Sequence, residues 1–134
     1  MPRLPRIQAV LIADQVLQEK GSNKWSVIGV FDRIYAHSFP VLHHTMGIYV
    51  RLTDAEGGYD VKLELQDALD RTIAVFGGIR LQVLDPKYSV DFGVQTRNLI
   101  LTGPGKHLIR VYLNADLVDQ VPLEVVLQPQ GGPN

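Results

Sequence analysis

Alternation of apolar and polar residues runs through the chain from about residue 46 onward and constrains its fold more than any other feature. Met46, Ile48, Val50 and Leu52 alternate with smaller or more polar neighbours, and the same period recurs over 61–65, 79–83, 90–94 and 107–113. A period of two places successive side chains on opposite faces of a pleated strand. Strands with one packed face and one wet face are typical of antiparallel sheets.

Turn residues separate these runs at 54–58, 67–70, 85–87, 103–105 and 114–116. Short strands with turns at this spacing are typical of sandwiches and barrels. We therefore predict an all-β chain, an antiparallel immunoglobulin-like β-sandwich of about seven to nine strands. Runs 46–52 and 61–65 are expected to pair as a hairpin. The pair Gly77-Gly78 is expected to form a bulge or a change of sheet.

The last two runs predict a C-terminal hairpin from roughly Lys106 to Leu127. The apolar residues of 117–125 would also fit one face of a helix, but Pro122 argues against it. In a helix interior proline loses a hydrogen bond and clashes with the preceding turn, at a cost of about 3 kcal/mol. In an edge strand it only leaves one donor position empty. We therefore predict that the last strand lies at a sheet edge.

The first third of the chain is less regular. Residues 7–13 and 25–31 resemble strands, whereas 14–20, followed by Gly21, fits either a short helix or an irregular hairpin. Residues 128–134 are rich in proline, glycine and glutamine, which is typical of a flexible tail. We expect a single domain over residues 1–127 and a flexible C-terminal tail over 128–134.

Charge and cysteine content narrow the classes of function. The 134 residues include 13 basic and 14 acidic ones, a net charge of -1 that does not fit a nucleic-acid-binding chain. The absence of cysteine excludes disulfides and thiolate chemistry and suits a reducing cytoplasm. The apolar stretch at 7–13 is too short for an export signal, and no stretch approaches the roughly 20 apolar residues that span a bilayer. We expect a soluble, cytoplasmic protein that binds neither nucleic acid nor membrane.

Several blocks of the sequence carry a family resemblance. They are Leu11-Ile12-Ala13-Asp14, the segment 25–34 that reads WSVIGVFDRI, Phe39-Pro40, Pro104-Gly105 and Pro122-Leu123. The blocks resemble a widespread bacterial family of small uncharacterised β-sandwich proteins with an LIGVFDRI-like block and a following FP pair. The turn at 21–24 is two residues longer than the form usual in that family. The resemblance implies a bacterial β-sandwich and brings no activity with it.

Residues that could carry catalysis or bind a metal have simpler structural interpretations. Asp14 and Asp32 end apolar runs, where aspartate commonly hydrogen-bonds turn backbone. His43 and His44 are adjacent, so on a strand they point to opposite faces and cannot both bind one ion, although His37 with one of them could do so in a loop. No G-x-S-x-G motif or phosphate-binding glycine loop before a helix occurs. We therefore predict no enzyme activity, no catalytic residue, no cofactor and no metal.

Two aromatic residues are candidates for a ligand-binding platform. Trp25 and Tyr49 could present flat amphipathic rings to a glycan or another small ligand. Tyr49 lies on the face opposite the apolar row of its strand. For Tyr49, and likewise for Tyr112, the alternative that we favour is that the ring covers a second packed face or an interface.

The outer face of the C-terminal hairpin is expected to be unusually apolar. Its row consists of Leu108, Tyr112, Val118 and Val126. Exposed apolar patches on small domains often mark self-association or partner binding. We therefore predict a non-enzymatic interaction or structural module that assembles with itself, as a homo-oligomer, or with a protein partner through its C-terminal sheet. The alternative is a small-ligand or carbohydrate-binding β-sandwich.

Overall fold

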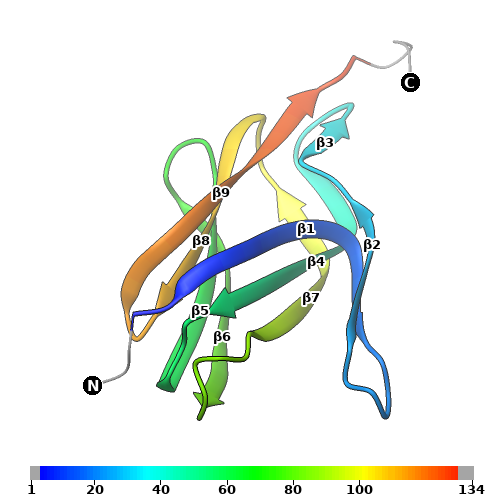
Figure 1. Cartoon of the computed structure of the whole chain (residues 1–134). Helices are drawn as coiled ribbons and strands as arrows, with labels where there is room; N and C mark the ends of the chain where they lie inside the picture. Colours follow the sequence, from blue (N-terminus) through cyan, green and yellow to red (C-terminus); the bar gives the residue numbers. More distant parts are fainter. Residues whose placement is uncertain (1–3, 130–134) are drawn as a thin grey trace.

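The computed structural model describes residues 4–129 and folds them into nine strands (Figure 1). In chain order these are β1 (Arg6–Gln18), β2 (Trp25–Val30), β3 (Arg33–Ala36), β4 (Val41–Thr53), β5 (Gly57–Gln66), β6 (Thr72–Val83), β7 (Val90–Leu101), β8 (Gly105–Leu113) and β9 (Asp116–Leu127). The all-β prediction is confirmed. Over residues 4–129 there is no helix long and apolar enough to cross a membrane.

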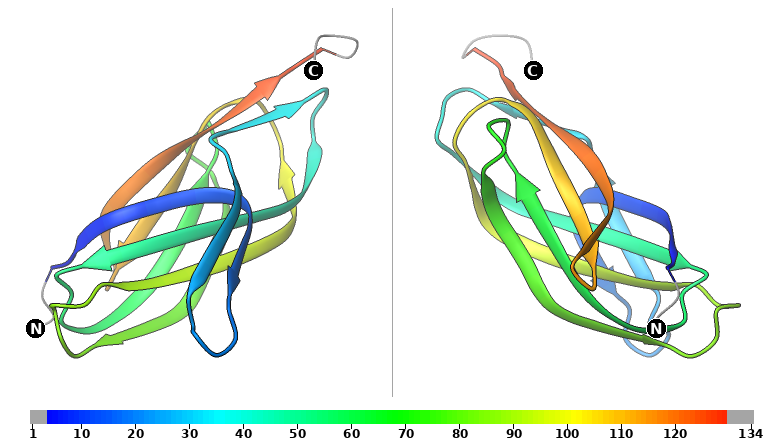
Figure 2. Two further views of the ribbon diagram at one scale, coloured as in Figure 1. Left: turned by 45° about the vertical axis from the view of Figure 1, so that its right-hand side comes forward. Right: turned by 90° about the vertical axis from the view of Figure 1, so that its left-hand side faces the viewer.

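The strands form two sheets that pack on one core. Sheet A has the order β2-β1-β4-β7, and sheet B has the order β3-β9-β8-β5-β6. Sheet B curls into a half-barrel (Figure 2). Every pairing is antiparallel except that of β3 with β9, which is parallel over Arg33–Ala36. The predicted antiparallel arrangement therefore has one exception, which arises because the chain crosses from sheet A to sheet B just before β3.

The alternating rows identified in the sequence face the core. Ile48 and Val50 of β4 oppose Leu63 and Leu65 of β5 across the two sheets, and each is almost fully buried. Burying one such aliphatic side chain stabilises the fold by about 1.5–3 kcal/mol. The rows therefore fix which face of each strand turns inward.

The expected hairpin of 46–52 with 61–65 is wrong, because β4 belongs to sheet A and β5 to sheet B. The chain between them arches over the end of the core. Ala55 is fully buried in this arch, and the Tyr59 hydroxyl hydrogen-bonds both the backbone N–H and the carbonyl of Glu56. Tyr59 thus ties the arch to β5, and β5 pairs with β6 and β8 instead.

Two other predictions about the strands are confirmed. Gly77 and Gly78 lie where the register of β6 against β5 shifts, between Phe76 and Ile79, so the pair forms a bulge within one strand. The C-terminal hairpin is the β8–β9 pair, in which Gly105–Leu113 of β8 runs antiparallel to Asp116–Val125 of β9.

The prediction that the last strand lies at a sheet edge holds for part of β9 only. β3 pairs with it over Glu124–Leu127, so the residues before Glu124 have a ladder partner only in β8. The N–H of Glu124 donates to the Asp32 carbonyl outside β8 at 2.9 Å. Pro122, two residues earlier, has its nitrogen on the same side, where no ladder bond is lost.

The segment 14–24, for which the sequence leaves a helix and a hairpin open, is a hairpin. β1 pairs with β4 up to Ala13 and with β2 from there to Gln18. The distal part of this β1–β2 hairpin, which we call the arm, crosses in front of β4 and β7 on the outer face of sheet A (Figure 2). The Gln95 side chain of β7 holds the arm, because it accepts from the Val16 N–H and donates to the Asp14 carbonyl, both at 3.0 Å.

Ordered contacts continue past the last strand. The Gln128 N–H donates to the Ala36 carbonyl at 2.7 Å, and the Gln128 carbonyl lies 2.8 Å from Nδ1 of His37. Of the tail predicted over 128–134, residues 130–134 lie outside the described residues.

Candidate functional site

Exposed margins of β1 and β9 border a hollow of about 460 Å³ on one side of the molecule. Val10–Ile12 of β1, the connection Val30–Asp32, and Val121 and Pro122 of β9 line it. We call it the β1–β9 hollow. Its lining side chains are apolar except that of Asp32, although polar atoms contribute a comparable share of its surface.

The connection Val30–Asp32 is held rigidly between the sheets. The Phe31 N–H donates to the Ile12 carbonyl of sheet A, and the Asp32 carbonyl accepts from Glu124 of sheet B, both at 2.9 Å. Two consecutive residues therefore join the two sheets. They belong to the block that carries the family resemblance, so this block has a structural role at the least.

Few backbone donors remain along the part of β9 that β3 does not cover. The Gln120 N–H donates to the Asp119 carboxylate at 2.8 Å, Pro122 has no N–H, and the Glu124 N–H is taken by Asp32. Occupied or missing donors protect an edge against pairing with another strand. A partner at this hollow would therefore be held mainly by side-chain contacts.

Large apolar side chains are exposed around the hollow. Val30 is 60% exposed, and Leu11 is 36% exposed. Tyr35, at 56%, borders a second hollow that also contains Val30 and Phe31. Exposed apolar groups concentrated at a concave site often mark a contact surface.

The second hollow has a volume of about 440 Å³ and a polar side. Asp14 and His43 line it, and we call it the Asp14–His43 hollow. Asp14 lies at the bend of β1 beside Gly29, whose φ is 74°. A Cβ atom on Gly29 would collide with Oδ2 of Asp14, so glycine leaves this carboxylate room. The ring of His43 meets Phe31 edge-on, with centroids 5.8 Å apart.

Burial lowers the pKa of His43, and the nearby Asp14 carboxylate and a hydrogen bond to the Thr45 backbone offset this only in part. The ring is therefore neutral at pH 7. Its Nε2 is buried and has no hydrogen-bond partner within the described part of the chain. On the other side of the hollow, a hydrogen bond with Tyr35 is the main cause that raises the pKa of Arg33, and Asp32 adds to it.

The candidate ligand aromatics Trp25 and Tyr49 do not form an open platform. Trp25 belongs to the arm, whereas Tyr49 lies on β4. Tyr49 is 9% exposed, and the half-buried Trp25 ring rests on Gly93 of β7, where a Cβ atom would lie 2.7 Å from the ring. Val16 packs against Gly47 in the same way. Both rings therefore pack against the outer face of sheet A, the arrangement that we favoured for Tyr49.

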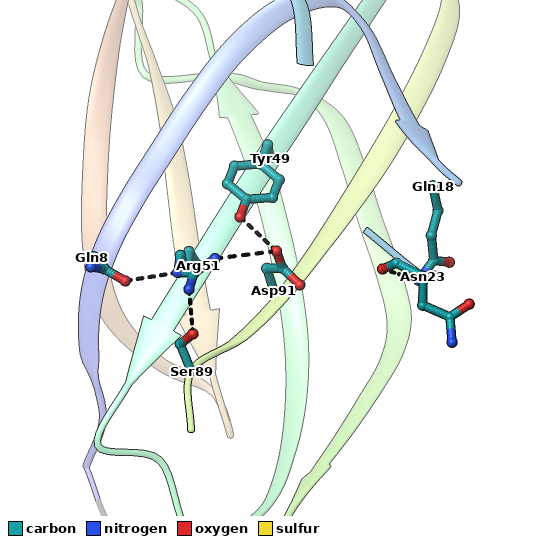
Figure 3. A network of polar contacts seen from close by, with 7 residues as sticks. All are labelled: Gln8, Gln18, Asn23, Tyr49, Arg51, Ser89 and Asp91. Carbon is teal, nitrogen blue, oxygen red and sulfur yellow. Dashed lines mark hydrogen bonds and ion pairs between the residues drawn. The ribbon is translucent and has the colours of Figure 1, made fainter. Parts of the chain in front are cut away.

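A polar network surrounds Tyr49 on this face (Figure 3). The Tyr49 hydroxyl donates to Asp91 at 2.6 Å, and Arg51 donates to Gln8 at 2.9 Å and to Ser89 at 2.6 Å. Burial and the bond with Asp91 raise the pKa of Tyr49. The hydrogen bonds satisfy the polar groups at the margin of this packed face, which is a structural role.

The four predicted interface residues do not form one row. Val118 packs against the core, because the register of β9 shifts between the partners of Val111 and Tyr112 and turns Val118 inward. Leu117 takes its place opposite Tyr112. The prediction that places Val118 on the outer face is therefore wrong.

The other three lie half-buried on the outer face among polar neighbours. Leu108 lies between Gln66 and Pro122, and Val126 lies beside Tyr35. The ammonium of Lys62 covers the Tyr112 ring at 4.6 Å. This face is more mixed in polarity than the alternation suggests.

The histidines do not gather into a metal centre. His37 is bound to Gln128, and His107 is fully buried with Nδ1 at 3.0 Å from the Gly105 carbonyl. Residues 4–129 contain no group of three or more His, Cys, Asp or Glu side chains that could hold a metal ion.

Sequence reasoning missed the roles of Val30, Val121 and His43 in lining hollows. A usable signal existed for Val30 and for its neighbours Asp14 and Arg33, because the blocks that carry the family resemblance meet at these hollows. For Val121 and His43 the alternation gave no such signal, since it reports the face of a strand and not the space beside it.

The fold and the two hollows define a two-sheet all-β domain with candidate contact surfaces. The chain belongs to a family of unknown function (DUF6941), whose model matches residues 8–126. The predicted membership of an uncharacterised family is confirmed at that level.

No curated protein matches the chain in sequence. Among solved structures, the Pseudomonas fluorescens alkylpurine DNA glycosylase AlkC, bound to DNA containing an abasic site analog, is similar with a TM-score of 0.52 and 11% identity. The match covers 71% of this chain and 27% of the glycosylase chain. At this identity the similarity concerns the fold alone.

Proposed function

We propose that this domain is a non-enzymatic interaction module that binds a protein partner, or a second copy of itself, at the β1–β9 hollow beside its C-terminal sheet. The observation that carries the proposal is the exposed apolar margin of this hollow, with Val30 60% and Leu11 36% exposed. Removing such groups from water favours association by about 25 cal/mol per Å². The partner would be held mainly by side-chain contacts, since few backbone N–H donors of β9 are free.

The hollow is a better candidate than the outer face of sheet B. On that face Lys62 pairs with Glu64 at 3.2 Å and covers Tyr112, so docking there would desolvate charged groups. In the β1–β9 hollow only Asp32 is charged, and its carboxylate is exposed at the margin.

Light scattering at micromolar concentration tests the proposal. Val30→Asp is compared with Val75→Asp, which changes the same residue type at 55% exposure on β6 of sheet B. We expect wild type and Val75→Asp to associate, with themselves or with a partner isolated by pull-down. Val30→Asp should bind at least about tenfold more weakly, because it buries an unpaired charge. A wild-type chain that is strictly monomeric and captures no partner contradicts the proposal.

The fold class within this proposal is immunoglobulin-like. Strands β1, β4 and β7 share one sheet and β5, β8 and β9 share the other, an alternation that corresponds to strands A, B, E and C, F, G of that fold. β6 lies beside β5, while β2 and β3 are additions at the sheet margins. The curled shape of sheet B departs from a flat sandwich.

A small-ligand or carbohydrate-binding domain is the second candidate. Its original support, an open platform of Trp25 and Tyr49, is weakened by their packing on the outer face of sheet A. The polar Asp14–His43 hollow is the feature that favours it.

The proposal places the protein in the cytoplasm and includes no role with membranes or nucleic acid. The glycosylase of similar fold is bound to DNA, but the net charge of -1 here gives little attraction for phosphates.

A further inference from the structure

One carboxylate in the Asp14–His43 hollow stands without a partner. Asp14 is exposed at the bend of β1, and its backbone carbonyl is bonded by Gln95. Within residues 4–129 the carboxylate itself makes no hydrogen bond and no ion pair. Gly29 lacks the side chain that would cover it.

The cationic groups nearby do not neutralise this carboxylate. Arg33 lines the same hollow, but its guanidinium bonds Tyr35 and lies 3.8 Å from the Asp32 carboxylate. His43 is kept neutral by burial, so it adds no positive charge at pH 7. Its Nε2 is shielded from solvent, so the Asp14 carboxylate is the acceptor that the hollow presents to a ligand.

The remaining lining is apolar, from Val30, Phe31 and Ile34, with the exposed Tyr35 ring at the margin. A volume of about 440 Å³ leaves room for a chain of several carbon atoms. An ammonium group offers N–H donors and a positive charge to the unpaired Asp14 carboxylate, and its alkyl chain suits these walls.

We propose that the Asp14–His43 hollow binds a primary ammonium group on a short alkyl chain, carried either by a free amine or by a lysine side chain of another protein. The site adjoins the β1–β9 hollow and shares Val30 and Phe31 with it, but its charged group is a different one. The proposal therefore does not depend on partner binding at the β1–β9 hollow, and it names the ligand class for the second candidate function.

Nuclear magnetic resonance titration of the full chain with n-butylammonium chloride tests the proposal. We expect saturable shifts at the amides of Gly29, Val30 and Tyr35, with a dissociation constant of about a millimolar. Asp14→Asn, which preserves shape, should weaken binding at least about tenfold, because it removes a charge-assisted hydrogen bond. Asp14→Glu, which keeps the charge, should remain within about threefold of wild type.

The matched control is Asp116→Asn, an exposed carboxylate at the start of β9 and away from the hollow, and it should leave binding unchanged. A second titration uses a short lysine peptide and its acetylated form. Binding of the peptide and not of its acetylated form identifies lysine as a source and supports the proposal, as does binding of butylammonium. The absence of saturable shifts with both ligands, or equal weakening by Asp14→Asn and Asp116→Asn, would overturn it.

Discussion

At the scale of single residues, two positions shape the Asp14–His43 hollow. One is set by its backbone conformation and the other by the burial of its side chain. Gly29 has a φ of 74° and touches Asp14, while Gly77 has open space where a Cβ atom would lie. The half-buried His43 ring is kept in its neutral form, because burial lowers its pKa. The sequence alone shows these residues as an ordinary glycine and an ordinary histidine, because neither a φ angle nor burial is visible in it.

Gly29→Ala should reduce the free energy of unfolding by about 1–3 kcal/mol, because alanine is strained at positive φ and its Cβ would displace Asp14. Gly77→Ala is the control and should change it by less than about 0.5 kcal/mol. Urea denaturation measures both. Equal effects of the two substitutions would show that the close approach of Asp14 is unimportant.

His43 should make stability fall as pH decreases. Its folded pKa lies below the ordinary 6.5, so the unfolded chain takes up the proton first when pH drops through 6.5. Above pH 6.5 the ring is neutral in both states, so its contribution to the free energy of unfolding does not change with pH. Below the folded pKa both states are protonated, and the contribution is again constant. His43→Gln should remove this fall, whereas His44→Gln, at an exposed position, should keep it. The test is the denaturation midpoint measured between about pH 7 and pH 5. If the midpoint of His43→Gln falls with pH as steeply as that of wild type, the prediction is contradicted.

At the scale of strands, the period-two pattern predicts faces well and partners poorly. It correctly turned Ile48, Leu63 and Val111 inward, because burial decides which face packs. It could not show that β4 and β5 lie in different sheets, since a tight hairpin and an arch use similar turn residues. It also misplaced Val118, because one extra residue in a bulge reverses the pattern.

The arm is the element that the sequence left most open, and its packing can be tested by the only tryptophan, Trp25. Gly93→Val should displace the ring and shift its fluorescence emission to longer wavelength, since a Cβ atom at 93 would lie 2.7 Å from it. Gly103→Val, with nothing within 4 Å, should leave the emission unchanged. If both variants match wild type, the arm does not lie on β7 as described.

At the scale of the whole molecule, the two sheets share one core and leave hollows beside the connection that joins them. The packing of the two sheets brings β1 of one sheet beside β9 of the other, and no local pattern in the chain reports that contact. The sequence predicts a contact region at the C-terminal sheet, which stays a prediction. The structure shifts the candidate from the outer face of that sheet to the apolar space beside β9.

Methyl nuclear magnetic resonance is the measurement that tests this central claim most directly. Spectra of the wild-type chain are compared between dilute and concentrated samples, and with and without a captured partner. The account predicts shifts at the methyl groups of Val10, Val30 and Val121, with those of Leu108 and Val75 unchanged. Shifts confined to Leu108 and Val75 on sheet B, or no shift at any of the five, would contradict it.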